Sequence, residues 1–192
     1  MATTQPIRDK KEIQALVNYY LDKGELRNYL LIVMGLYTAL RISDLLRLTW
    51  DDVYDFRANC LRLSFSIKEK KTGKVKIVAL NKEVLKALAK FKNSTAVMPG
   101  QPLFQSRKTK GAIGRTQAYR IIKQASNSLA LSVPVSCHSL RKTFGYHAVK
   151  AGASPAVVME IYNHSSYAVS RRYLGLNQDE QNQVYWSLAL LG

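Results

Sequence analysis

The sequence predicts an α+β fold that is mainly α-helical and carries one small antiparallel β-hairpin. Apolar residues recur three or four positions apart over most of the chain, which is the spacing of amphipathic helices. Between residues 61 and 79 apolar and polar residues alternate instead, which is typical of half-buried strands. The chain has 192 residues, of which 47% are hydrophobic, so it is long and apolar enough for one domain with a sizeable core.

The N-terminal part of the chain predicts helices only. The first helix is marked by five apolar residues on one face: Ile13, Leu16, Val17, Tyr20 and Leu21. Gly24 is expected to end it. Residues 25–39 form a more thoroughly apolar helix, which we expect to be the central buried one. A short helix is predicted over residues 43–48.

A β-hairpin with a lysine-rich turn is predicted next. The apolar positions are Leu61, Leu63, Phe65 and Ile67 on the first strand and Val75, Ile77 and Ala79 on the second. The turn between the strands covers residues 70–74 and reads KKTGK. We expect the apolar positions of both strands to face the core.

Helices return after the hairpin, with Asn81 as the expected N-cap of the first. Residues 93–114 are rich in loop-forming residues and are predicted to hold one short strand at Leu103-Phe104. Further helices are predicted over residues 116–129, 138–150, 155–162, 168–173 and 177–190. Asn177 is the expected N-cap of the last one.

Positive charge is concentrated in the middle of the chain. The formal net charge is +16, from 29 Lys and Arg against 13 Asp and Glu. Residues 61–120 hold fifteen basic and two acidic residues, which accounts for +13 of that charge. A focused positive surface attracts polyanions, so nucleic acid is the favoured partner. A solvated surface or a patch for anionic lipid remains an alternative.

Several classes of protein are excluded by missing motifs. The chain has no GxxxxGK[ST] or GxGxxG phosphate loop, no HExxH, and no zinc spacing among its three histidines and two cysteines. The longest nearly apolar run, residues 29–40, is shorter than the about 20 residues that a membrane span needs. No signal peptide is recognisable at the N-terminus. We expect a cytoplasmic protein that needs no metal or cofactor and binds no membrane.

The remaining polar motifs suit phosphoryl transfer without a metal, which needs cations, a proton donor and a nucleophile. Arg41 stands where a deeply apolar helix ends, and a half-buried arginine is costly unless it meets an anion. His138 and Arg141 are three residues apart on one helix face. Tyr173 follows His164 by nine residues.

This constellation resembles the tyrosine recombinase (phage integrase) family. The family pattern is an arginine in a T-[GA]-x-R-x-[ST]-[DE]-L context, a hairpin lysine, an H-x-x-R box, a histidine or tryptophan, and a tyrosine. Six positions match in order and with family-like gaps: Arg41, Lys71, His138, Arg141, His164 and Tyr173. The match spans residues 41–173 and their flanks, essentially the family's catalytic domain. H-x-x-R alone is common, and the specificity comes from the six positions together.

The resemblance implies double-stranded DNA as partner and a covalent mechanism. Tyr173 would attack the scissile phosphate, giving a 3′-phosphotyrosyl link and a free 5′-hydroxyl. Arg41, Arg141 and His164 would bind the non-bridging oxygens and stabilise the transition state. The link keeps the energy of the broken bond, so rejoining needs no ATP.

The remaining site residues are assigned in the same way. Lys71 would protonate the departing 5′-oxygen, His138 would act as acid and base on the tyrosine proton, and Asp44 would orient Arg41 or His138. Eight further basic residues are expected to bind DNA: Lys68, Lys70, Lys74, Lys76, Arg107, Lys108, Lys110 and Arg115.

Two departures from the family pattern stand out. The family's Leu-Gly-His is replaced by Tyr162-Asn163-His164, and Asn163 is expected to adopt the left-handed conformation that glycine would supply. Only about forty residues precede Arg41, so we expect residues 1–192 to be a catalytic domain without the family's N-terminal DNA-clamping domain. It would be an excised domain or a short member resembling the fimbrial-switch invertases.

The resemblance also implies an assembly. The last helix carries Val184, Leu188 and Leu191, which would be core in a monomer or would dock on a neighbouring protomer in a homotetramer on DNA. DNA-bending proteins are the accessory partners to expect.

The main hypothesis is a site-specific recombinase acting in integration, excision or inversion. The alternatives are a catalytically silent DNA-binding protein of the same fold and a type IB topoisomerase. A basic RNA-binding module is a weaker alternative, because the chain lacks an aromatic-rich strand motif of the kind that single-strand readers use.

Overall fold

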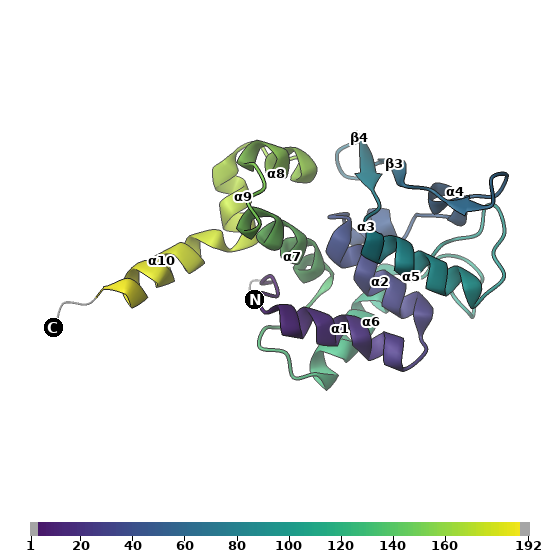
Figure 1. Ribbon diagram of the computed structural model, residues 1–192, viewed down its shortest axis with the longest axis horizontal. Helices are drawn as coiled ribbons and strands as arrows, with labels where there is room; N and C mark the ends of the chain where they lie inside the picture. Colours follow the sequence, from purple (N-terminus) through teal and green to yellow (C-terminus); the bar gives the residue numbers. More distant parts are fainter. Residues whose placement is uncertain (1–3, 189–192) are drawn as a thin grey trace.

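The computed structural model describes residues 4–188 and is mainly helical, as the sequence predicts. The helices are α1 (Lys10–Asp22), α2 (Leu26–Tyr37), α3 (Ile42–Leu45), α4 (Trp50–Val53), α5 (Lys82–Asn93), α6 (Arg115–Ser128), α7 (Cys137–Lys150), α8 (Pro155–Tyr162), α9 (Tyr167–Leu174) and α10 (Leu176–Ser187). The strands are β1 (Tyr54–Asp55), β2 (Cys60–Leu61), β3 (Ser64–Lys68) and β4 (Val75–Ala79). Figure 1 shows a helical body with α8, α9 and α10 to one side.

Helix α2 is the centre of the body, which confirms the prediction. Its residues 28–36 are all buried, and α1, α5 and α7 pack around it. It stops at Tyr37, before the predicted end, because Ala39 adopts a left-handed conformation with φ +53°. An L-residue in this conformation cannot continue a right-handed helix.

The strands form two separate two-stranded sheets, β1–β2 and β3–β4, where the sequence predicts one. The predicted first strand is interrupted at residues 62–63, and Leu63 is 74% exposed. The predicted face of the second strand is wrong: Val75 and Ile77 are exposed, whereas Val78 is buried. Phe65 pairs with Val78, and cross-strand partners point to the same side of a sheet. A register displaced by one residue exchanges the two faces of a strand.

Two smaller predictions are also wrong. Leu103 and Phe104 are buried but form no strand; isolated bridges join Thr49 to Pro102 and Gln105 to Ala112 around them. Helix α10 begins at Leu176 directly after Gly175, which is in the left-handed conformation, and so Asn177 does not cap it. The predicted end of this helix near residue 190 and the apolar Leu191 lie outside the described residues.

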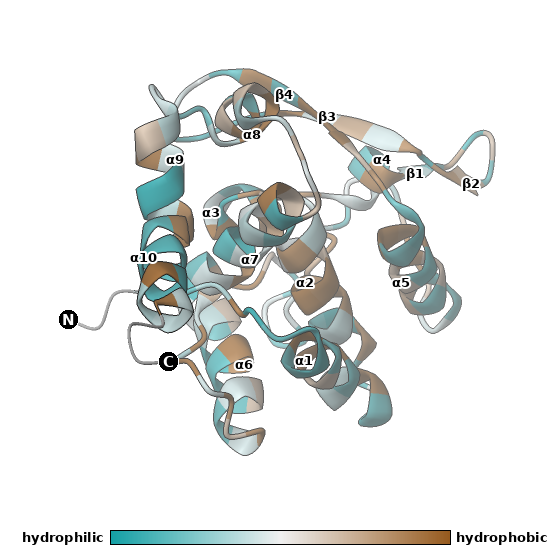
Figure 2. Cartoon of the chain, turned by 60° about the vertical axis from the view of Figure 1, so that its left-hand side comes forward, coloured by the Kyte–Doolittle hydropathy of each residue, from teal (hydrophilic) through white to brown (hydrophobic). Residues whose placement is uncertain are grey.

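The C-terminal helices form a second, smaller apolar cluster beside the main core. Its buried members are Ala39, Tyr146, Val158, Tyr162, Leu174 and Leu176. Beyond it, α10 extends away from the body (Figure 1). Brown apolar residues also appear on α10 in Figure 2, and Val184, Tyr185, Trp186 and Leu188 are exposed. Within residues 4–188, no helix combines the length and apolarity needed to cross a membrane.

Candidate active site

Arg141 occupies the centre of a cationic site between the two apolar clusters. Its side chain is buried on α7, and its guanidinium lies 4.5 Å from the centre of the Tyr162 ring. Nη1 donates to the carbonyl oxygen of Ala39 and Nη2 to that of Tyr162, 3.5 Å away. The left-handed backbone at Ala39 directs its carbonyl toward Arg141, which gives the T-[GA]-x-R context a structural role. Arg141 is therefore held by groups from both sides of the site.

Tyr173 lies next to Arg141 and His164. Its ring packs edge-on against that of His164, with centroids 5.2 Å apart, and the Lys142 ammonium lies 5.0 Å from its centre. Burial raises the pKa of the Tyr173 phenol, while the charge of Arg141 and a hydrogen bond from it oppose the rise. The hydroxyl is therefore a neutral phenol at neutral pH and needs a base to become a nucleophile.

His164 is oriented by a residue of α9. Its Nδ1 lies 2.9 Å from the hydroxyl oxygen of buried Ser170, which leaves Nε2 for another partner. Burial, followed by the charges of Arg141 and Arg41, lowers the pKa of His164. Asn163, just before it, has φ +54° and ends α8, so the left-handed conformation expected there is confirmed.

Arg41 meets a carboxylate that the sequence analysis missed. Its Nη1 lies 3.0 Å from Oε1 of Glu69, whose side chain is fully buried. The two atoms attract as charges but lack hydrogen-bond geometry, so the N–H of Arg41 can still bind another acceptor. Glu69 and Glu83 are the only acidic residues between positions 61 and 120, and an acid this isolated in a basic hairpin is the signal that could have identified it.

The sequence predicts that Asp44 orients Arg41 or His138, but the structure shows the Asp44 carboxylate in contact with other residues. Its buried carboxylate accepts a 2.9 Å hydrogen bond from the Lys70 amide and lies 3.7 Å from Arg47. The residue therefore fixes the base of the hairpin turn. The reason is local: α3 directs position 44 toward the hairpin, and Glu69 already faces Arg41.

Lys71 and His138 lie on the same side of the site as Arg41. The three residues line a cavity of about 370 Å³ together with Ile42, Ser43, Lys70 and Arg115. Partial burial lowers the pKa of His138, and so do the nearby charges, first Arg141 and then Lys142, Arg41 and Lys71. A neutral imidazole can accept a proton, so His138 is suited to the role of a base.

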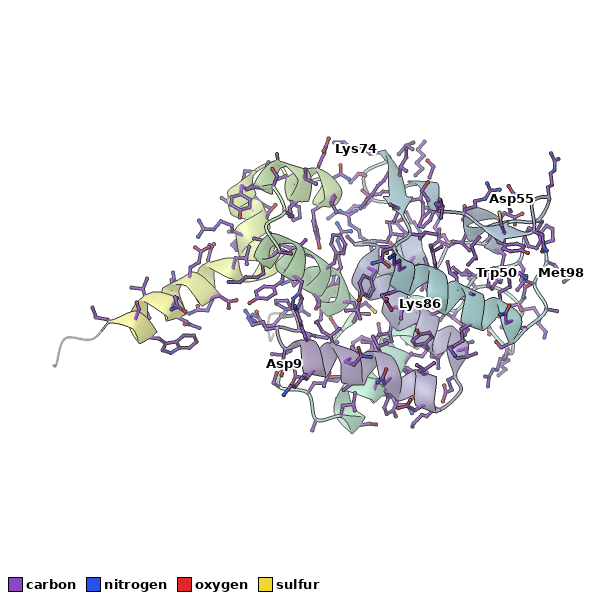
Figure 3. The ribbon with its side chains drawn as sticks, viewed as in Figure 1. Asp9, Trp50, Asp55, Lys74, Lys86 and Met98 are labelled. Carbon is purple, nitrogen blue, oxygen red and sulfur yellow. The ribbon has the colours of Figure 1, made fainter. Side chains whose placement is uncertain are left out.

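The basic residues expected to bind DNA fall into four groups: three hairpin lysines, Lys76 alone, three residues of the loop before α6, and Arg115 alone. Lys68, Lys70 and Lys74 are exposed on the hairpin, with Lys74 at its tip (Figure 3). Lys76 does not belong with them, because the residue is half-buried and its Nζ donates to the carbonyl oxygen of Ile161 at 2.9 Å. Burial, followed by the charge of Arg141, lowers the pKa of Lys76 to about 8.

The third group is on the loop before α6. Arg107 and Lys110 line a cavity near Arg27 at the start of α2, and Lys108 is exposed between them. Arg41 follows the other end of this helix, whose twelve residues span about 18 Å. These three residues are therefore outside the site, whereas Arg115 lines the cavity of Arg41.

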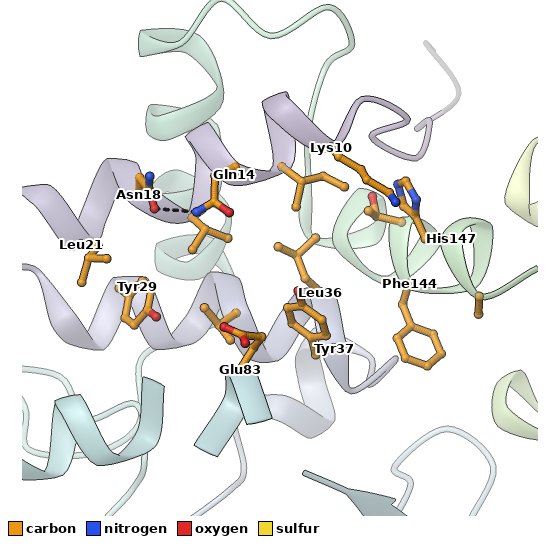
Figure 4. Close-up of a pocket in the computed structure, with 15 residues that line it drawn as sticks. Lys10, Gln14, Asn18, Leu21, Tyr29, Leu36, Tyr37, Glu83, Phe144 and His147 are labelled. Atoms are coloured by element: carbon orange, nitrogen blue, oxygen red, sulfur yellow. Dashed lines mark hydrogen bonds between the residues drawn. The ribbon is translucent and has the colours of Figure 1, made fainter. Parts of the chain in front are cut away.

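A third hollow, which Tyr173 does not line, lies among α1, α2 and α7. It has a volume of about 620 Å³ and is lined mainly by apolar side chains, among them Ile13, Val17, Leu21, Leu36 and Phe144. Figure 4 shows these helices around it, with Lys10 and His147 at one end. We call it the α1–α7 groove. In the described part of the chain, no three His, Cys, Asp or Glu residues form a group that could hold a metal ion.

Comparison with known proteins identifies the architecture. Residues 8–180 match the sequence model of the Phage integrase family. The chain belongs to this family. Its members include tyrosine recombinases, enzymes that cleave and rejoin DNA.

Relatives in the family differ in how much of their length this chain covers. A probable integrase/recombinase, YoeC of Bacillus subtilis, is 35% identical over 185 residues, which cover 96% of this chain and 97% of YoeC. The tyrosine recombinase XerD of Corynebacterium glutamicum is 27% identical over 84% of this chain. The chain spans about half of that protein, 52% of its length.

Solved structures show the same fold. The XerA recombinase superimposes with a TM-score of 0.74 at 22% identity, over 95% of this chain and 65% of that one. The XerH site-specific recombinase, solved in a post-cleavage complex with its palindromic difH substrate, gives 0.71 at 20% identity. That alignment covers 95% of this chain and 53% of XerH.

Proposed function

We propose that this protein is a tyrosine recombinase that cleaves and rejoins double-stranded DNA through a 3′-phosphotyrosyl intermediate. The observation that carries the proposal is the position of Tyr173 beside Arg141 and His164, close enough to Arg41 for its charge to act on the phenol. A phenol next to paired guanidinium groups is suited to attack a phosphodiester, because the cations stabilise charge that develops on the non-bridging oxygens. The basic middle of the chain provides the surface for the DNA backbone.

The proposed reaction uses only side chains of the site. The Tyr173 oxygen forms a bond to phosphorus while its proton passes to neutral His138. The bond from phosphorus to the 5′-oxygen breaks, and the Lys71 ammonium donates a proton to that oxygen. Arg41, Arg141 and His164 hold the non-bridging oxygens throughout. Attack by a 5′-hydroxyl on the phosphotyrosine reverses the sequence and rejoins a strand without ATP.

The substitution Tyr173→Phe tests this proposal. The protein is mixed with nicked suicide duplexes from DNA flanking its gene, in EDTA, and covalent adducts are resolved on a denaturing gel. The wild-type protein is expected to give a protease-sensitive adduct, and the variant none, with DNA affinity unchanged. Tyr167→Phe, at the start of the same helix α9, is the matched control and should form the adduct.

Two other outcomes of this experiment would each contradict part of the proposal. Binding without an adduct in the wild-type protein would support a catalytically silent DNA-binding protein. An adduct that persists in Tyr173→Phe would show that another residue is the nucleophile. Binding is expected to weaken steeply with salt, because contacts to phosphates dominate it.

We further propose that α10 joins protomers into a homotetramer on DNA. The helix leaves the body of the protein (Figure 1), and Tyr185 and Trp186 are 77% and 76% exposed. Aromatic residues of this size anchor protein interfaces, and the α1–α7 groove of a second copy offers an apolar surface to receive them. On this proposal the protein acts on DNA in the cytoplasm, in integration, excision or inversion, with DNA-bending proteins as accessory partners.

The assembly is tested by Trp186→Ser. Light scattering after gel filtration on a DNA duplex should show a smaller complex for the variant than for the wild-type protein. Tyr119→Ser, an exposed aromatic residue on α6, is the control and should leave the mass unchanged. An unchanged mass for Trp186→Ser would contradict the role given to α10.

A further inference from the structure

Glu69 is a buried carboxylate at the point where three parts of the site meet. The residue is 1% exposed, although the residues on either side of it, Lys68 and Lys70, are exposed. Burying a carboxylate is costly unless it is paired and hydrogen-bonded. The partners of the Glu69 carboxylate must therefore offset the cost of its burial, and they indicate its role in the site.

Each of its contacts comes from a different part of the site. Oε1 lies 3.0 Å from Nη1 of Arg41. Oε2 accepts hydrogen bonds of 2.8 Å from the Thr72 hydroxyl, inside the lysine turn, and from the side-chain amide of Asn163. One carboxylate thus connects the first arginine, the hairpin turn that carries Lys71, and the turn that carries His164.

The contact with Asn163 gives a reason for the departure from the family's Leu-Gly-His. Position 163 has φ +54°, a conformation that glycine adopts freely and that asparagine tolerates. Glycine would satisfy the backbone but could not donate to Glu69. Asparagine does both, so the side chain at this position has a function in addition to its backbone conformation.

A second contact links the same two segments. Lys76, on β4, donates from Nζ to the carbonyl oxygen of Ile161, two residues before Asn163. Figure 2 shows α8 lying close to the β3–β4 hairpin, as these two contacts require. The hairpin is thus fastened to the end of α8 at two points, by Glu69 directly after β3 and by Lys76 on β4.

The electrostatics keep this carboxylate ionised. Burial by itself raises the pKa of the Glu69 carboxyl, but the hydrogen bond from Thr72 and the charge of Arg41 outweigh it, so that the pKa is below its ordinary value. Glu69 is therefore negatively charged at neutral pH, and its charge holds Arg41 against the hairpin.

We propose that Glu69 is a positioning residue for DNA strand cleavage, which fixes Arg41, the Lys71 turn and the Asn163-His164 turn in one arrangement, with Asn163 as its dedicated donor. This inference rests on the function proposed above. Misplacing a catalytic group by about 1 Å can lower a rate by about 100-fold. Loss of the Glu69–Asn163 contact, which leaves each group on its own element, is expected to slow cleavage by about 10-fold.

The test compares Asn163→Gly, Glu69→Ala and the double variant with the wild-type protein. Asn163→Gly keeps the left-handed turn and removes only the donor. Asn59→Gly is a matched control, because Asn59 also has a left-handed backbone, with φ +53°, and its side chain is also hydrogen-bonded, as the acceptor from the Tyr54 hydroxyl, but it takes no part in the Glu69–Asn163 contact. Three quantities are measured: the single-turnover rate on a nicked suicide duplex, DNA affinity, and hydrogen exchange of residues 68–76.

We expect about 10-fold slower cleavage in both single variants, affinity within about 2-fold of wild type, and faster hydrogen exchange in the hairpin. The double variant should be no slower than Glu69→Ala, since that change already removes the contact with Asn163. Asn59→Gly should match the wild type in all three measurements.

The inference is overturned if Asn163→Gly cleaves at the wild-type rate, if the two rate effects multiply in the double variant, or if hairpin exchange is unchanged. Hydrogen exchange does not depend on catalysis. If the wild-type protein forms no adduct, the proposed function fails, while the exchange of Asn163→Gly still decides whether Glu69 fastens the hairpin.

Discussion

The two apolar clusters of this protein differ in size and in what they hold. The larger one, built around α2, supports the backbone on which Arg41 and the hairpin stand. The smaller one, centred on Tyr162 and Leu174, supports Tyr173. A segment with few buried apolar contacts opens at a lower free energy than a densely packed one. Arg41 and the hairpin lysines therefore stand on the more firmly packed part of the molecule, and the proposed nucleophile on the less firmly packed part.

Helix α7 is the element that joins the clusters. Leu140 belongs to the larger cluster and Tyr146 to the smaller one, and Arg141 lies between them. Arg141 bonds to the carbonyl oxygens of Ala39 and Tyr162, so its side chain contacts residues ahead of α3 and at the end of α8. One buried guanidinium therefore both serves the site and connects the two apolar clusters that support it.

The largest effect is expected from Arg141→Lys. The substitution keeps the positive charge but loses the planar fork that reaches both carbonyl oxygens. Cleavage of a suicide duplex should fall at least about 100-fold, the size of effect seen when one preorganised donor is removed from a transition state. Arg172→Lys, at an exposed position on α9, should cleave normally. Near-normal cleavage by Arg141→Lys would show that the charge suffices and that the link between the clusters is unimportant.

The next largest effect is expected from overpacking each apolar cluster in turn, which compares how each one contributes to the free energy of unfolding. A Cβ at Gly35 would lie 2.7 Å from Leu140 Cδ1, and one at Gly145 would lie 2.6 Å from both Leu174 Cδ2 and the Tyr162 hydroxyl. Overpacking of this kind costs about 1–3 kcal/mol. Gly35→Ala should lower the free energy of unfolding in urea by this amount. Gly145→Ala should instead accelerate hydrogen exchange in α9 with a smaller global loss.

The control for both is Gly111→Ala, where an added Cβ comes no closer than 3.8 Å to another atom and the backbone is not left-handed. This variant should unfold as the wild type does. Equal global losses for Gly35→Ala and Gly145→Ala would mean that the two clusters unfold as one unit.

The smallest effect concerns pH and the contact of Lys76 with α8. In the folded protein the pKa of Lys76 is about 8, whereas its ordinary value is 10.5. Between these values the unfolded chain binds more protons than the folded one, so this residue makes the free energy of unfolding rise with pH through that window. Lys76→Met should remove this contribution. Urea unfolding of both proteins at pH 7.5 to 10.5 measures it, and parallel pH profiles would contradict the assignment.

The helical part of the fold was largely predictable from the sequence, because it rests on local periodicity. The central helix, the helix with the H-x-x-R box and the left-handed conformation at Asn163 all follow from residue type and spacing. The hairpin faces were not predictable in the same way. Val75 and Val78 are both apolar, and only the pairing register with Phe65 decides which of them is buried.

The site was predictable as a set of positions but not as a set of contacts. The order of six residues along the chain predicted a common site, and the structure places three of them, Arg41, His164 and Tyr173, near Arg141. The partners of Asp44 and the burial of Glu69 depend on how the hairpin meets α3 and α8, which are contacts between segments distant in sequence. A lone acid in a basic hairpin gives a hint of such a contact but does not name its partner.

The contact between Glu69 and Asn163 also bears on the order in which the two residues were acquired. Asparagine at position 163 needs no partner, because it tolerates the left-handed backbone and its amide can bind water. A glutamate buried at position 69 before that amide was present would have lacked one of its hydrogen-bond donors, at a cost in stability. We therefore expect asparagine to have preceded glutamate in the ancestry of this chain, with the acid at position 69 confined to relatives that have a donor at position 163.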